Sequence, residues 1–228
     1  MNKEQRWKTM LISAAKAGDI KALARRCKLG FLRADPQSEA LSWAAYNGHL
    51  ECVKFLIPLC DVQANQSMPF RYAAMSGRLE ALKLLLPFSD PKALNSDALG
   101  QAALYGHVEC LMFLIPLCDV EAHYSLALQH AARNGHLGCL KLLLPLSDPK
   151  AQDSEAFRQA ARNNHLECLE LLLPVSDLHG IYEPRLSDAL RNSQTSSFLF
   201  VLQKASEERS ALESASCAAA PKRIKPRL

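Results

Sequence analysis

Four histidine–cysteine pairs are the residues of this sequence whose types and spacing could do chemistry. In each pair the histidine precedes the cysteine by three positions, a spacing at which the two could bind a metal ion or form a base–nucleophile pair. The same spacing recurs in four of the five regular copies of a repeated pattern, and the fifth copy has Arg78 and Ala81 instead. We therefore interpret the cysteines as small buried residues and the histidines as turn residues, and we expect no metal and no cofactor. The pairs are His49/Cys52, His107/Cys110, His136/Cys139 and His165/Cys168.

Common enzyme signatures are absent from the sequence. It has no glycine-rich phosphate loop, no H-E-x-x-H motif and no G-x-S-x-G motif. His123, Tyr124 and His130 lie close together in the sequence, but they form no known catalytic motif. The sequence therefore predicts a protein without catalytic activity.

A repeated pattern organises the chain and must position any functional residue. Its marker is an Ala-Ala pair that recurs at a spacing of 29 residues, with one further pair, Ala14-Ala15, 30 residues before the first of them. A fixed period of this length indicates stacked repeats that share one continuous core. The regular pairs are Ala44-Ala45, Ala73-Ala74, Ala102-Ala103, Ala131-Ala132 and Ala160-Ala161.

The pattern divides the chain into three predicted parts. Residues 1–7 form a polar lead-in, 8–204 form the repeat array, and 205–228 form a basic tail that we expect to be disordered. Inside the array, a degenerate N-terminal capping unit and a C-terminal cap enclose five regular units. The unit boundaries are 8–37, 38–66, 67–95, 96–124, 125–153, 154–182 and 183–204.

Each regular unit predicts two antiparallel helices. The serine that opens a unit, such as Ser96, is expected to cap the first helix, whose small residues form the buried face. A glycine ends this helix, and one unit has Asn164 instead, which also accepts the left-handed backbone conformation. The second helix is apolar except for a narrow stripe of charged residues, and a proline such as Pro58 closes it.

This unit resembles the ankyrin repeat. The resemblance rests on A-A-x-x-G-H between the helices, on G-H-L-E-C-V-K-F-L-I at residues 48–57, and on D-V-x-A at residues 61–64. The usual T-P-L-H opening survives only as a leucine or phenylalanine, and the unit is four residues shorter than the usual repeat of about 33. The resemblance implies an all-α, ankyrin-type helical solenoid of stacked antiparallel helix pairs, with truncated β-hairpin fingers.

In ankyrin arrays, the exposed side of the first helices lines a concave groove that binds other proteins. This side varies between the units here, from aromatic and apolar to basic. Exposed aromatic residues with arginine nearby are typical of binding hot spots, although some of these rings could simply cover neighbouring helices. The residues expected to contact a partner protein are Trp43, Tyr46, Tyr72, Met75, Leu104, Tyr105, His130, Arg133, Arg158 and Arg162.

The composition of the chain bears on nucleic-acid binding, membrane insertion and cellular location. The net charge of +4 argues neither for nor against nucleic-acid binding, but the acidic residues interleaved among the basic ones argue against it. No apolar run approaches the ~20 residues that span a bilayer, so we expect no membrane segment. The eight cysteines occupy positions typical of free thiols, which favours a cytoplasmic or nuclear location. We expect a monomer that binds another protein and no small-molecule substrate.

The basic tail leaves an alternative open. It ends in P-K-R-I-K-P-R-L, a pattern that fits nuclear import and also fits the export signal of a bacterial effector acting in a host cytosol. The alternative to a plain interaction module is therefore a secreted effector or a nuclear-targeted adaptor whose tail is an address signal. A solvated tail without a signal is equally compatible with the sequence. The four cations are Lys222, Arg223, Lys225 and Arg227.

Overall fold

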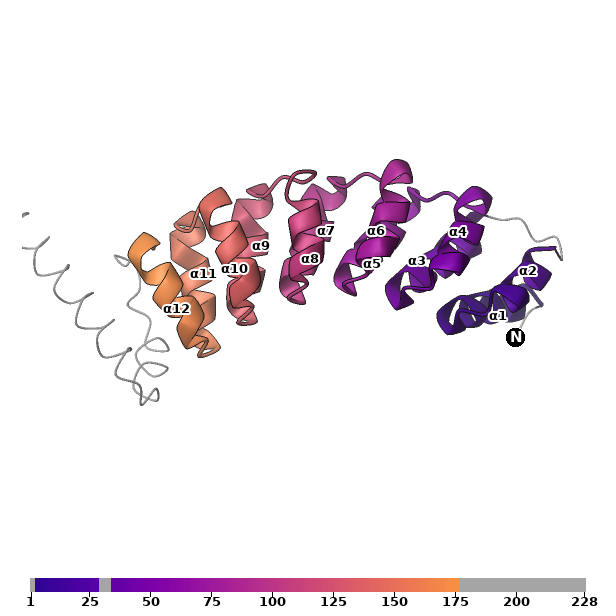
Figure 1. The fold of residues 1–228 in the computed structure, drawn as a ribbon, viewed down its shortest axis with the longest axis horizontal. Coiled ribbons are helices and arrows are strands. Elements are labelled where there is room, and N and C mark those ends of the chain that lie inside the picture. Colours follow the sequence, from indigo (N-terminus) through magenta and orange to yellow (C-terminus); the bar gives the residue numbers. More distant parts are fainter. Residues whose placement is uncertain (1–2, 29–33, 177–228) are drawn as a thin grey trace, which may run out of the picture.

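The computed structural model describes residues 3–28 and 34–176. Figure 1 shows them as an arc of helix pairs that stack side by side in chain order. No strand occurs within these two ranges, which confirms the predicted all-α solenoid. The predicted C-terminal cap (183–204) and basic tail (205–228), with its four cations, lie outside the described residues.

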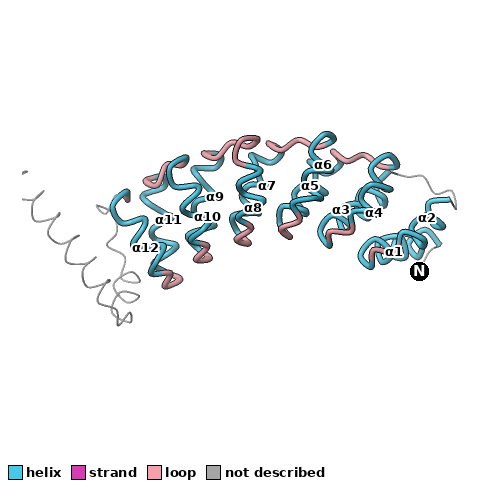
Figure 2. Tube along the Cα trace, viewed as in Figure 1, coloured by secondary structure: helices cyan, strands magenta, loops and turns pink. Residues whose placement is uncertain are grey.

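Each unit contributes one pair of α-helices, and four of the second helices continue into a short 3₁₀ helix. Figure 2 shows loops along both edges of the arc: turns within a pair follow the inner edge, and loops between pairs follow the outer edge. The pairs are α1 (Lys3–Ala17) and α2 (Ile20–Lys28), α3 (Ala34–Asn47) and α4 (Leu50–Leu56), α5 (Ala64–Met75) and α6 (Leu79–Leu85), α7 (Ala93–Leu104) and α8 (Val108–Leu114), α9 (Ala122–Arg133) and α10 (Leu137–Leu143), α11 (Ala151–Arg162) and α12 (Leu166–Leu172). The 3₁₀ helices are η1 (Ile57–Leu59), η2 (Leu86–Phe88), η3 (Leu144–Leu146) and η4 (Leu173–Val175).

Helix α1 starts earlier than the first predicted unit. It begins at Lys3, inside residues 1–7, and the indole N–H of Trp7 donates to the carbonyl of Arg26 on α2 at 3.3 Å. Part of the predicted lead-in therefore belongs to the first helix pair.

Small residues let the first helices stack closely. The five regular Ala-Ala pairs are 0–2% exposed and lie on helices that contact one another, α3 with α5 and onward to α9 with α11. Phe70 and Leu99, together with leucines and cysteines of the second helices, extend this into one continuous core. The predicted buried face is confirmed. Ser42 and Gly100 are also buried, and both are small enough to fit between stacked helices.

A glycine and a histidine form the joint between consecutive units. Gly106 follows α7 with φ of +75°, and Asn164 takes the same left-handed conformation with φ of +59°, as predicted. The imidazole of His136, from the next unit, lies so close that a Cβ at Gly106 would be 2.6 Å from its Nδ1. The Nε2–H of His136 donates to the carbonyl of Leu104 at 3.0 Å. The histidine therefore ties one unit to the preceding one, which confirms its structural interpretation.

The same joint recurs along the array. His49, His107 and His165 each donate from Nε2 to a carbonyl of the preceding unit, at 2.9, 3.1 and 3.0 Å. Arg78 replaces the histidine once, and its Nε donates to the corresponding carbonyl at 3.4 Å. The sequence after residue 182 holds no histidine that could take this place in the predicted C-terminal cap.

The hydroxyl of the serine that opens a unit does not cap its own helix, which corrects our prediction. Ser67 and Ser96 are the last residues of a short left-handed segment, with φ of 57° and 64°, and the right-handed part of α5 and of α7 begins directly after them. Their Oγ atoms accept the backbone N–H of Asp90 and Asp119 at 2.9 and 2.8 Å. Because this hydroxyl bonds the loop that leads to the next unit, it is not available to cap its own helix.

The residue after the proline-containing turn is cysteine or serine, and its hydrogen bonding differs between units. Cys60 Sγ donates to the carbonyl of Leu56 at 3.1 Å, and Ser176 Oγ donates to that of Leu172 at 2.8 Å. The Oγ atoms of Ser89 and Ser147 are buried and have no hydrogen-bond partner among the described residues.

We predict that Ser147→Ala stabilises the protein by about 1 kcal/mol, because it removes a buried hydroxyl that has lost its hydrogen bonds to water. Urea unfolding monitored by circular dichroism measures this change. Ser176→Ala is the matched control: it removes a hydroxyl that does have a partner, and it should destabilise by about 1 kcal/mol. Equal effects of the two substitutions would contradict the assignment.

Candidate functional site

Three aromatic rings from two units pack against one another on α3 and α5. The ring centroids of Trp43 and Tyr46 are 5.7 Å apart, those of Trp43 and Tyr72 5.8 Å, and those of Tyr46 and Tyr72 6.2 Å. All three contacts are edge to face, which places the positive edge of one ring on the negative face of the next. We call these residues the aromatic cluster. Because all three rings are only half-buried, the cluster is a preformed apolar surface.

A lysine that was not predicted from the sequence lies beside the aromatic cluster. Lys16 Nζ lies 3.7 Å from the ring centroid of Trp43, a cation–π contact that brings a third unit into the site. Lys16 follows its Ala-Ala pair as Tyr46 and Met75 follow theirs. Its position in the repeat could therefore have identified it, but we had treated the first unit only as a cap.

The apolar surface continues along the first helices beyond the aromatic cluster. Met75 on α5 and Leu104 on α7 are half-buried, and Tyr105, directly after α7, is 46% exposed. The ring of Tyr105 is stacked with the imidazole of His107, with centroids 6.4 Å apart and 19° between the planes. The predicted apolar residues thus lie on consecutive first helices or at their ends.

The basic end of the predicted site is less cationic than its sequence suggests. Glu155 on α11 accepts hydrogen bonds from Arg158 at 2.8 Å, from Gln159 at 2.6 Å and from Arg162 at 3.2 Å. Arg158 also donates to the carbonyl of Gln152 at 3.0 Å, in the left-handed turn that begins α11. Arg158 therefore supports its own helix.

His130 and Arg133 differ in charge. Burial lowers the pKa of His130, although the hydrogen bond from its Nδ1 to the carbonyl of Gly100, at 3.2 Å, opposes this shift. The lowered pKa makes His130 a neutral residue near pH 7. Arg133 is exposed and has no ion-pair partner among the described residues, so it is the open cation at this end of the surface.

The histidine–cysteine pairs do not form reactive sites. The cysteines of all four pairs are buried, and burial is the main cause that raises the pKa of Cys110 and of Cys139 to about 11. A thiol with a raised pKa is a weak nucleophile near neutral pH, because little thiolate forms. Over residues 3–28 and 34–176, no group of three or more His, Cys, Asp or Glu residues is placed to hold a metal ion. No helix within these ranges is long and apolar enough to cross a membrane.

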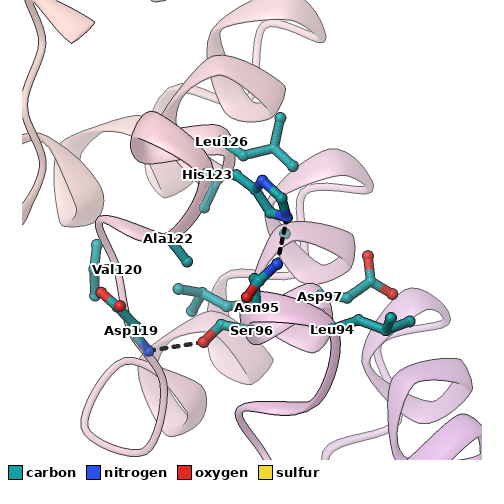
Figure 3. Close-up of a pocket in the computed structure, with 12 residues that line it drawn as sticks. Leu94, Asn95, Ser96, Asp97, Asp119, Val120, Ala122, His123 and Leu126 are labelled. Atoms are coloured by element: carbon teal, nitrogen blue, oxygen red, sulfur yellow. Dashed lines mark hydrogen bonds between the residues drawn. The ribbon is translucent and has the colours of Figure 1, made fainter. Parts of the chain in front are cut away.

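A small cavity lies where α7 and α9 begin. Figure 3 shows Asn95 and His123 facing each other at its rim, where the amide of Asn95 donates to Nε2 of His123 at 2.7 Å. The figure also shows Ser96 Oγ bonded to the backbone N–H of Asp119. The cavity volume is about 110 Å³, well below the roughly 300–1,000 Å³ of typical ligand pockets.

Comparison with known families agrees with this architecture. A family model of ankyrin repeats matches three overlapping stretches of the chain, residues 11–95, 70–153 and 99–182. The chain belongs to the ankyrin-repeat family. The search of curated proteins returned no match. Ankyrin repeats are generally protein–protein interaction modules, which directs attention to the exposed face of the first helices in this ankyrin-repeat array.

Proposed function

We propose that this ankyrin-repeat protein is a non-catalytic module that binds another protein across the exposed face of its first helices, with this face forming the floor of a concave groove. The observation that carries the proposal is the aromatic cluster of Trp43, Tyr46 and Tyr72. Its rings hold one another in fixed orientations and remain half open to solvent. Rigid aromatic side chains of this kind supply large contact area at a low cost in conformational entropy.

The charges beside this face indicate the chemistry of the partner. Lys16 lies over Trp43, and Arg133 is exposed without an ion-pair partner among the described residues. An extended or helical segment with apolar anchors and acidic residues would place its anchors on the aromatic cluster and its carboxylates near these two cations. Arg158 and Arg162 contribute less, because Glu155 already accepts hydrogen bonds from both.

A cytoplasmic location is part of the same proposal. Cys52, Cys110, Cys139 and Cys168 are free and buried on the second helices of different units. Thiols used as small apolar core residues suit a reducing compartment.

The test is capture of a partner from cell lysate, followed by direct measurement of its Kd. We expect the wild-type protein to retain the partner and the Trp43→Ala/Tyr72→Ala/Arg133→Ala variant to release it. Loss of each aromatic hot-spot side chain costs about 2 kcal/mol, or about thirtyfold in Kd. Circular dichroism should show unchanged helicity, because all three side chains are at least partly exposed.

A matched control changes the opposite layer of the array. Lys54→Ala/Lys83→Ala removes two exposed lysines from α4 and α6 and should leave the measured Kd unchanged. Equal affinity of the wild-type and triple-variant proteins for the captured partner would refute the assignment of this face.

A further inference from the structure

The second helices carry a charged stripe that repeats from unit to unit. On α4, Glu51 pairs with Lys54 at 2.8 Å, and on α6, Glu80 pairs with Lys83 at 2.7 Å. All four side chains are exposed, so each pair contributes only a few tenths of a kcal/mol and mainly keeps this surface polar. In these two units, the charged stripe is a solvent-exposed row of ion pairs, and it serves as the reference pattern for the other second helices.

Helices α8 and α10 depart from this pattern at neighbouring positions. Met112 stands on α8 at the position where α4 and α6 have a lysine, and its side chain is 59% exposed. Gly138 stands on α10 at the position where α4 and α6 have a glutamate. Glycine within a helix is about 1 kcal/mol less favourable than alanine. A Cβ at Gly138 would lie 3.1 Å from Cγ2 of Val108, which is itself 36% exposed. The two helices contact each other, so together they form an open apolar surface.

These two departures each leave one charge without its partner. Glu109 has no lysine three residues later, and Lys141 has no glutamate three residues earlier. Both side chains are exposed, and neither has an ion-pair partner in the described part of the chain. We call Val108, Glu109, Met112, Gly138 and Lys141 the α8–α10 patch. It combines an apolar centre with one free anion on α8 and one free cation on α10.

We propose that the α8–α10 patch is a self-association surface that binds the same patch of a second copy of this chain. In a two-fold interface each surface contacts its own copy, so a residue pair i–j occurs twice. A two-fold axis between Glu109 and Lys141 places Glu109 of each copy against Lys141 of the other, and it brings the two Met112 side chains together. The missing charges of the stripe are then supplied by the partner copy. This weak dimer replaces the monomer expected from the sequence.

The proposed dimer leaves the partner-binding face open. In Figure 1, α8 and α10 belong to the row of second helices, which lies in front of the row of first helices. The aromatic cluster lies on α3 and α5, in the other row. Self-association and partner binding therefore use different layers, and each is tested independently of the other.

Sedimentation velocity of the full chain over a concentration series, from about 1 µM to 1 mM, tests this proposal. We expect the average mass of the wild-type protein to rise from 25.2 kDa toward twice that value. Met112→Lys gives α8 the lysine found on α4 and α6, so it should stay monomeric throughout. Glu109→Lys and Lys141→Glu should each stay monomeric as well, because each places like charges opposite one another.

Two further samples distinguish a two-fold dimer from any other association. The double variant Glu109→Lys/Lys141→Glu restores both ion pairs with reversed charges and should dimerise again. A mixture of the two single variants should form a heterodimer, because one then carries two cations and the other two anions. Lys83→Met is the matched control: it exposes a methionine on α6 beside Glu80 and should dimerise like the wild type. A monomeric wild type, a Met112→Lys dimer or an unrestored double variant would each overturn the proposal.

Discussion

Gly106→Ala is expected to destabilise the protein by about 2–3 kcal/mol, although it adds only one methyl group. Two costs combine. A residue with a Cβ loses about 1–2 kcal/mol in the left-handed conformation that Gly106 adopts with φ of +75°. The new Cβ would also lie 2.6 Å from Nδ1 of His136, so the imidazole must move and weaken its hydrogen bond to the Leu104 carbonyl, at about 1 kcal/mol more. Urea unfolding monitored by circular dichroism measures the total.

A double-mutant cycle separates the two costs. In a His136→Ala background the imidazole is gone, so Gly106→Ala should cost only the 1–2 kcal/mol of the backbone conformation. Asn164→Gly is the comparison at the last described joint, where φ is +59° and the sequence after residue 182 holds no histidine. That substitution should be close to neutral. If Gly106→Ala cost the same with and without His136, the contact between glycine and histidine would not hold the units together.

The repeats themselves explain how much of the fold could be predicted. The Ala-Ala pairs, the turn glycines and the prolines each answer a local requirement: close helix packing, a left-handed residue, and the end of a helix. Such requirements depend on neighbours within the unit or in the next copy, so they appear at a fixed period in the sequence. The exchange of glycine for Asn164 predicts the left-handed position from the sequence alone, and φ is positive there in the structure.

Side-chain contacts at the loops between helix pairs were harder to predict. Ser96 was expected to cap its own helix, but its Oγ accepts from Asp119, 23 residues along the chain. Arg158 was expected to face a partner, but its side chain contacts Glu155 and the carbonyl of Gln152. Both residues were placed by their position in one unit, whereas their partners depend on the path of the shortened loop that leads into each first helix. That path contains left-handed residues such as Asn95, which helix periodicity does not reveal.

The candidate site likewise contains some residues that the repeat pattern predicted and others that it did not. The variable positions of the first helices predicted the residues of the aromatic cluster, because large rings occur there on the exposed side of helices whose buried side is mostly alanine. They did not predict Lys16, which belongs to the degenerate first unit but lies over Trp43. The unmatched charges Glu109 and Lys141, in contrast, follow from the repeat, because Met112 and Gly138 stand at the unit positions that form the ion pairs Glu51–Lys54 and Glu80–Lys83.

Phe70→Ala is expected to destabilise the protein by about 3–5 kcal/mol. Phe70 is fully buried and is among the largest side chains of the core, in the second regular unit. Truncation to alanine loses the transfer free energy of the ring and leaves a cavity between helices that are already closely packed. Because each unit contacts only its neighbours, a weakened internal unit also reduces the coupling between the two ends of the array. We therefore expect a lower urea midpoint and a broader transition.

The chain supplies its own controls for this prediction. Leu41, Leu99 and Leu128 occupy the equivalent position in other units and are also fully buried, so Phe70→Leu should cost only about 1 kcal/mol. Tyr72→Ala, two residues away on the outer side of α5, should cost less than Phe70→Ala because its ring is only half-buried. A small loss at Phe70 together with a large loss at Tyr72 would show that the aromatic cluster belongs to the core. The expected order would show instead that its rings are free to bind a partner.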